Sequence, residues 1–222
     1  MIDLKKLVKS DPITRNVEKG LEQMEHTPMD PPSAYNQPGN LTQSINRFEK
    51  SIEILKEEHK VAITYIDSFE KALVLFKSSS YQLDNNINQT FGDFFKYFDS
   101  ELLVHNKKEE KILFPLLHKR LIEAGEHSVG ENPMTAIDVM EDDHIKFIQL
   151  GTLTFNLLGL ATRIKDSGSK IFVLNTAYEN GRELIELLKL HIYREDHTLF
   201  PLAQKYLTKE EFETMDIEMH KL

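Results

Sequence analysis

The sequence predicts an all-α protein, an up-down-up-down four-helix bundle with an N-terminal extension and a short C-terminal helix. Apolar residues recur every three or four positions over several long stretches, which is the spacing that places them on one face of an α-helix. No segment alternates apolar and polar residues for long enough to predict a sheet. Long helical stretches separated by short joints are typical of a bundle.

Proline and glycine mark the ends of the predicted elements. Residues 1–40 are expected to form a partly irregular N-terminal extension, because five of the eight prolines fall there. Residues 41–222 are expected to form the bundle domain. Its first helix is predicted over about 41–77 and its second over about 83–124, where Gly125 supplies a left-handed cap.

The second half of the chain continues the same pattern. Asn132 and Pro133 predict an N-cap and a first helical residue, and the third helix is expected to end near Gly168. The fourth helix is predicted over about 169–207. Thr208 and Glu211 form a capping-box pattern that predicts a short final helix.

Composition narrows the classes of function. The chain has 222 residues, of which 40% are hydrophobic, so it can bury a sizeable core. The net charge of −9 argues against nucleic acid as a partner. Because cysteine is absent, disulfides, iron–sulfur clusters and thiolate zinc sites are excluded. The sequence has no apolar run of about 18 residues and no signal-peptide pattern at its start, so we expect no membrane partner and a cytoplasmic location.

The chain contains one helix pair twice. The fifteen residues that begin at His105 match the fifteen that begin at His191 at seven positions, including the histidine, a glutamate four residues later, and a Leu-Phe-Pro-Leu block. The five residues that end at His59 likewise resemble the five that end at His144. Each half therefore supplies one histidine from its first helix and a His-x3-Glu pair from its second.

These histidines and glutamates lie in the apolar register of their helices. Residues four apart share one helix face, so His105 and Glu109 are neighbours, and they continue the apolar stripe that includes Leu102. The same register holds for the other candidate ligands, which are His59, His144, His191 and Glu195. An unpaired carboxylate in an apolar core costs several kcal/mol, and a metal ion removes that cost by binding the lone pairs. The six residues therefore predict a buried metal site.

The ligand types leave iron, zinc, manganese and nickel open. Six protein ligands exceed the four that a tetrahedral zinc ion takes, whereas two ions that share bridging carboxylates would use all six. We expect two iron ions with an oxo or hydroxo bridge from solvent and a vacant position for a small ligand. The alternative to a metal is a buried histidine–glutamate hydrogen-bond network.

The pattern resembles the hemerythrin-like family, also called the HHE cation-binding domain, over residues 41–207. The matching elements are Glu58-His59, Asp143-His144, His105-x3-Glu109 with Glu110 and Leu113-Phe114-Pro115, and His191-x3-Glu195 with Leu199-Phe200-Pro201. The resemblance implies a non-haem di-iron site inside a four-helix bundle. It also implies a supporting role near the metals for Asp143 and Glu101, because relatives keep acidic residues at similar places.

Two departures distinguish the chain from the oxygen-carrying hemerythrins that it resembles. Those proteins have a fifth histidine where this chain has Ile148, and a longer His-x4-Asp spacing where it has His191-x3-Glu195. Four histidines with two glutamates are instead similar to di-iron proteins linked to the repair of iron–sulfur centres under stress. Those relatives usually carry a cysteine motif in an extra N-terminal domain, and this chain has no cysteine.

The sequence is therefore compatible with three functions. The first is a di-iron protein that binds or senses O2 or NO, or handles iron in a stress response. The second is a repair-type or redox-type di-iron enzyme. The third is a metal-free helical module that binds other proteins.

Overall fold

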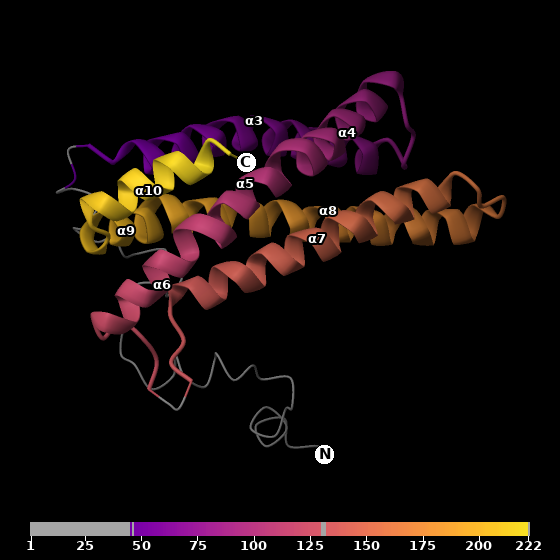
Figure 1. The fold of residues 1–222 in the computed structure, drawn as a ribbon. Coiled ribbons are helices and arrows are strands. Elements are labelled where there is room, and N and C mark those ends of the chain that lie inside the picture. Colours follow the sequence, from indigo (N-terminus) through magenta and orange to yellow (C-terminus); the bar gives the residue numbers. More distant parts are fainter. Residues whose placement is uncertain (1–44, 46, 130–131, 222) are drawn as a thin grey trace, which may run out of the picture.

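A computed structural model describes residues 45, 47–129 and 132–221, and helices account for most of them. Figure 1 shows long helices packed side by side, and the described residues contain no strand. The predicted all-α bundle is confirmed. The predicted extension over 1–40 lies outside the described residues, as do the first four residues of the predicted first helix.

Four rods form the bundle, and a short helix follows them (Figure 1). The first rod is α3, Lys50–Ser78, and the third is α7, Ala136–Ala161. The second and fourth rods are each divided by π-helical turns. The second comprises α4 Asn85–Tyr97, η2 Phe98–Leu102, α5 Leu103–Lys108, η3 Glu109–Leu113 and α6 Phe114–Glu123. The fourth comprises α8 Ser167–Arg194, η4 Glu195–Leu199 and α9 Phe200–Tyr206, and the short helix is α10, Lys209–Met219.

Several helix ends follow the predicted capping chemistry. Gly125 has φ 78°, the left-handed conformation expected after the second rod. Thr208 and Glu211 form the expected capping box, in which each side chain accepts from the other residue's backbone N–H. The side chains of Asp84 and Asp166 cap α4 and α8, since each accepts from a backbone N–H three residues later.

Three predicted boundaries are wrong. The first rod begins at Lys50, because Glu49 has an extended backbone and its N–H donates to the Gln204 side chain. The third rod begins after Thr135 and not at Asn132, since Thr135 forms a capping box with Asp138. That rod also ends at Ala161 instead of near 168.

Pro115 and Pro201 lie at the starts of α6 and α9, directly after the π turns η3 and η4. A proline has no N–H to donate, and its ring crowds the carbonyl four residues earlier. In each rod the residue before the proline donates its N–H five residues back, Phe114 to Glu109 and Phe200 to Glu195. The wider turns accommodate the two prolines, and each begins at a glutamate predicted to be a ligand.

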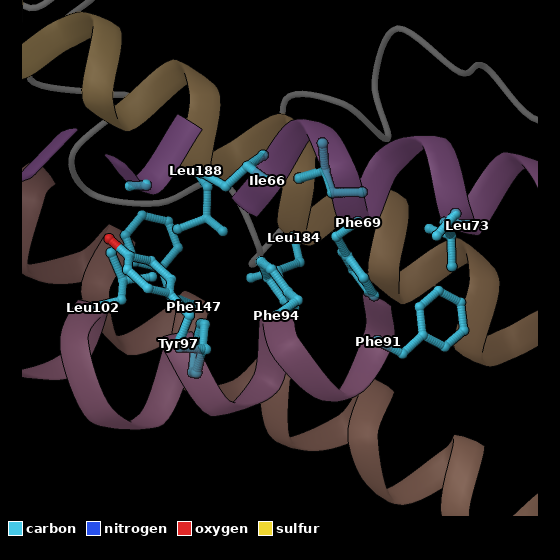
Figure 2. Close-up of a cluster of buried hydrophobic side chains, with 14 of the residues drawn as sticks. Ile66, Phe69, Leu73, Phe91, Phe94, Tyr97, Leu102, Phe147, Leu184 and Leu188 are labelled. Atoms are coloured by element: carbon cyan, nitrogen blue, oxygen red, sulfur yellow. The ribbon is translucent and has the colours of Figure 1, made fainter. Parts of the chain in front are cut away.

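The apolar core divides into two clusters, and the predicted ligands lie between them. Figure 2 shows the first cluster, where Phe69, Phe94, Leu184 and neighbouring side chains from α3, α4, α7 and α8 meet. The second cluster joins the first turns of α3 and α7 to α6, α9 and α10, with Leu55 and Phe200 among its buried residues. Along each rod the histidine therefore separates two apolar layers. No helix among the described residues has the length and apolar character needed to cross a membrane.

Candidate metal centre

The structure brings all six predicted ligands together in the middle of the bundle. Four of them are histidines, one from each rod, and each of these residues is at most 4% exposed. The two glutamates are fully buried. The ligand atoms fall into two groups, each with all atoms within 4.8 Å of one another: His59 and His105 with Glu109 and Glu195, and His144 and His191 with the same two glutamates.

Each glutamate faces both groups with different oxygens. Glu109 Oε1 lies 3.4 Å from His105 Nε2, and its Oε2 lies 3.5 Å from His144 Nε2. Glu195 Oε1 lies 3.1 Å from His191 Nε2, and its Oε2 lies 3.2 Å from His59 Nε2. Each carboxylate thus lies between a histidine of the first half and a histidine of the second, as a bridging ligand would.

The outer ring nitrogens of the first histidine pair face carboxylates. His59 Nδ1 lies 3.0 Å from Asp196 Oδ1, and His105 Nδ1 lies 2.8 Å from Glu58 Oε2. A carboxylate only accepts, so the Nδ1 atoms carry the protons and donate. In the neutral rings both Nε2 atoms then hold lone pairs, and these two atoms are only 3.0 Å apart.

The second pair repeats this arrangement with one looser contact. His144 Nδ1 lies 2.8 Å from Glu110 Oε1, and the Nε2 atoms of His144 and His191 are 3.1 Å apart. His191 Nδ1 is 3.5 Å from Asp143 Oδ2 and has no hydrogen-bond partner in the described structure. The outer carboxylates also connect the halves, because Glu110 of the second rod meets the third, and Asp196 of the fourth meets the first.

Aromatic rings complete the walls of the centre. The repeated Leu-Phe-Pro-Leu blocks contribute Phe200, which stacks on His59 at 5.4 Å between ring centroids, and Phe114, which stacks on His144 at 5.5 Å. Phe147 meets the His191 ring edge to face at 4.8 Å. These rings fix the imidazole planes and exclude water from the polar layer.

Protonation in the metal-free state shows how strongly the centre attracts positive charge. Burial alone would lower the pKa of His105, but the Glu109 carboxylate overrides burial and raises that pKa to about 10. For His191, burial acts in the same downward direction and the Glu195 carboxylate raises the pKa to about 9. Burial would raise the pKa of Glu195, but the charges of the His191 and His59 rings, whose Nε2 atoms lie 3.1 and 3.2 Å from its oxygens, hold it well below its usual value.

The donor set fits a pair of cations. All four glutamate oxygens are buried without a hydrogen-bond partner in the described residues, and three histidines present lone pairs toward them. Acceptors that face acceptors in an apolar core repel one another unless a proton or metal ion lies between them. Ligand atoms held by one ion at about 2.1 Å and about 90° apart are about 3 Å from each other, close to the observed Nε2 separations.

The sequence predicted only some of the carboxylates that lie beside the outer nitrogens of the histidines. The structure places Asp143 beside His191, whereas Glu101 is exposed and its carboxylate accepts from the Ser100 hydroxyl. The supporting role of Glu101 stays a prediction. Sequence reasoning missed Asp196. A usable signal was present, because an acidic residue directly follows each candidate glutamate and directly precedes each first-helix histidine.

Comparison with known proteins agrees with this geometry. Residues 50–203 match the hemerythrin HHE cation binding domain, and the match includes all six candidate ligands. No curated protein and no solved structure was found to match the chain. Because the matched region covers more than half of the sequence and its buried histidine–glutamate clusters suit a cation, the chain belongs to the hemerythrin HHE cation-binding domain family.

Proposed function

We propose that this protein binds two iron ions and that the iron pair binds or senses O2 or NO. The observation that most supports this proposal is that the two oxygens of each glutamate face different histidine pairs. Glu109 and Glu195 each direct one oxygen to a histidine of one half and the other oxygen to a histidine of the other half. Bridging carboxylates of this kind hold two metal ions close together.

The ligand count supports two ions of a metal that accepts more than four ligands. Each ion would receive two imidazole nitrogens and two carboxylate oxygens from the protein, in the groups His59, His105, Glu109, Glu195 and His144, His191, Glu109, Glu195. Structural zinc takes four ligands in a closed site, and the mixture of imidazole and carboxylate suits iron. Iron has further coordination positions, and these supply the chemistry for a diatomic ligand.

The rest of the chain supports such binding by keeping the centre rigid and dry. The outer carboxylates Asp196, Glu58 and Glu110 fix three imidazole rings with their Nε2 atoms inward. The apolar clusters on both sides of the polar layer keep water away from it. Small uncharged molecules such as O2 and NO enter an apolar interior more readily than ions do.

The proposal is tested by metal analysis of protein purified without oxygen and loaded with Fe(II). We expect two irons per chain, and charge-transfer absorption after exposure to O2 or NO. The Glu109→Gln, Glu195→Gln double variant should lose most of the bound iron, because it removes both bridging charges. A control variant, Glu179→Gln on the exposed part of α8, should retain two irons.

Two results would contradict the proposal. A colourless protein with a single zinc ion would show that the ligands serve a structural metal. A protein that takes up no metal, and whose thermal stability is the same with and without added iron, would instead favour a metal-free helical module. Both measurements use the full chain.

A further inference from the structure

Each of the four candidate histidine ligands has a carboxylate beside its outer nitrogen, and at three of them a lysine or arginine contacts that carboxylate. His59 meets Asp196, and Lys56 Nζ lies 3.1 Å from the same aspartate oxygen. His105 meets Glu58, whose other oxygen binds Lys108. Each carboxylate is therefore held between an imidazole and an ammonium group.

The second half repeats the arrangement at His191. Asp143 lies beside the ring, and Arg194 contacts the same aspartate oxygen at 3.2 Å. Arg194 corresponds to Lys108 in the internal repeat, because each lies three residues after the histidine of its His-x3-Glu pair. Asp143 is almost fully buried, with 3% of its side chain exposed.

His144 departs from this pattern. Its partner, Glu110, is 42% exposed, and within the described residues no lysine or arginine nitrogen lies within 4.0 Å of that carboxylate. The repeat position of Lys56 is occupied by Glu141, since each lies three residues before the histidine of its helix. Burial and the nearby Asp138 and Glu110 carboxylates raise the pKa of Glu141, which indicates that these acidic groups lie together.

We propose that the two metal positions differ in exchange rate, and that metal enters and leaves through the His144 side, so that the His144–His191 position is the labile one. The inference rests on the proposed metal-binding function. It concerns the association and dissociation rates of the two ions.

Electrostatics gives the first reason. A hydrated cation approaching the outer side of His59 or His105 meets a carboxylate already paired with Lys56 or Lys108. One approaching His144 meets two carboxylates, Glu110 and Glu141. Surface charge of one sign concentrates ions of the opposite sign and raises their association rate. Two cationic side chains near the second pair, Arg194 and Lys146, contact Asp143, the outer partner of His191, and not Glu110.

Ring mobility gives the second reason. A carboxylate fixed by both a ring and a cation restrains the imidazole, and the loss of such outer partners weakens metal binding. Among the described residues Glu110 pairs with the His144 ring alone, and its carboxylate is open to water. The His144 ring can therefore turn away from an ion more readily than the His59 ring, whose Asp196 partner is 23% exposed and bonded to Lys56.

Release kinetics test the inference. Protein loaded anaerobically with two Fe(II) ions is mixed with an excess of a chromogenic Fe(II) chelator, and the rate of complex formation is followed. We expect two phases of equal amplitude. The faster phase should be missing in His144→Ala and the slower phase in His59→Ala, while each variant retains one ion.

Charge-swap variants test the cause. Glu141→Lys gives the second half the lysine of the first and should slow the fast phase about 10-fold. Lys56→Glu should accelerate the slow phase by a similar factor. Glu179→Lys makes the same charge change on an exposed part of α8 and should leave both rates unchanged.

Release of both ions at one rate in the unmodified protein would overturn the inference while leaving the proposed function intact. Two phases that Glu141→Lys and Lys56→Glu leave unaltered would also overturn it. A protein that binds no iron would overturn the proposed function and this inference together. Since Lys56 and Glu141 are not among the six ligands, both variants should still load two ions.

Discussion

At the scale of single residues, the centre depends on the carboxylates behind the histidines. Glu58 and Asp196 each accept from an Nδ1 atom, and this fixes which nitrogen of each ring holds the lone pair. A histidine on an apolar helix face can direct either nitrogen inward. The outer carboxylate removes that freedom, and it does so from a neighbouring rod, so that ring orientation depends on how the rods pack.

Glu58→Ala should therefore weaken metal binding although Glu58 is not one of the proposed ligands. Loss of an outer partner of this kind typically lowers metal affinity 10–100-fold, and we expect a decrease in that range. Competition titration against a chelator of known affinity measures it. The matched control is Glu57→Ala, since Glu57 is 69% exposed and pairs only with Lys60 in the described residues. Equal affinity in the two variants would contradict the prediction.

The raised histidine pKa values predict how the stability of the metal-free protein depends on pH. His105 and His191 have folded-state pKa values of about 10 and about 9, above the ordinary value of 6.5. A group whose pKa is raised by folding stabilises the fold fully below its unfolded pKa, and that stabilisation is lost as pH rises through the folded pKa. The melting temperature of the metal-free protein should therefore fall between pH 6.5 and pH 10.

Thermal unfolding followed by circular dichroism at several pH values checks this expectation. The Glu109→Gln, Glu195→Gln double variant is the control, because it lacks the two charges that raise both pKa values, and its slope should be smaller. Metal-loaded protein should also show a smaller slope, since the ions replace the protons. A metal-free protein that became more stable between pH 6.5 and pH 10 would disagree.

At the scale of elements, turns and joints place the ligands. Glu109 and Glu195 each begin a π turn that ends before a proline, so the repeated sequence gives the same local structure twice. Another π turn, η2, lies in the second rod only, and Gly151 of α7 approaches its Phe98 ring so closely that an added Cβ would lie 2.9 Å from Phe98 Cζ. The two halves therefore differ in packing beside the centre.

Two glycines, one within the second rod and one just after its end, should respond to alanine in opposite directions. Gly125 has φ 78°, so Gly125→Ala imposes a left-handed conformation on a residue with a Cβ and should lower the free energy of unfolding by about 1 kcal/mol. Gly92 lies within α4, and beyond its own turn of the helix no atom lies within 4 Å of an added Cβ, so Gly92→Ala should raise this free energy by about 0.5–1 kcal/mol. Urea unfolding measures both, and a shift of the same sign in both variants would be inconsistent with this assignment.

At the scale of the whole molecule, the centre joins two similar halves. Each glutamate lies between histidines of both halves, and Asp196 and Glu110 make further contacts across them. The first apolar cluster lies on one side of this polar layer and the second on the other (Figure 2 shows the first). Metal ions at the centre would therefore connect all four rods at the same height.

Metal should accordingly stabilise the whole bundle. An ion that binds only the folded protein, at a free concentration 100 times its dissociation constant, adds about 2.7 kcal/mol to the free energy of unfolding. We expect a higher melting temperature with Fe(II) than after chelation, by calorimetry without oxygen. The increase should largely disappear in the Glu109→Gln, Glu195→Gln double variant. An equal increase in that variant would show that metal acts elsewhere.

The sequence by itself determined the helical fold, the six candidate ligands and several helix ends. Apolar spacing, the internal repeat and the capping residues are patterns of the sequence itself, so they can be recognised without a structure. Thr208 and Gly125 show this, since the conformations of their backbones follow from neighbours in the chain. The start of the first rod was missed because Glu49 bonds to Gln204, a residue far away in the sequence.

Only the tertiary structure decided how the ligands combine. Contacts between different rods decide which oxygen of Glu109 faces which histidine, and they bring Asp196 to His59. They also leave Glu110 with no lysine or arginine beside it within the described part of the chain. Spacing along a helix fixes the face on which a side chain lies, but the height and rotation of one rod against another come from packing. The sequence specified the groups of the centre, and the packing of the rods specified their partners.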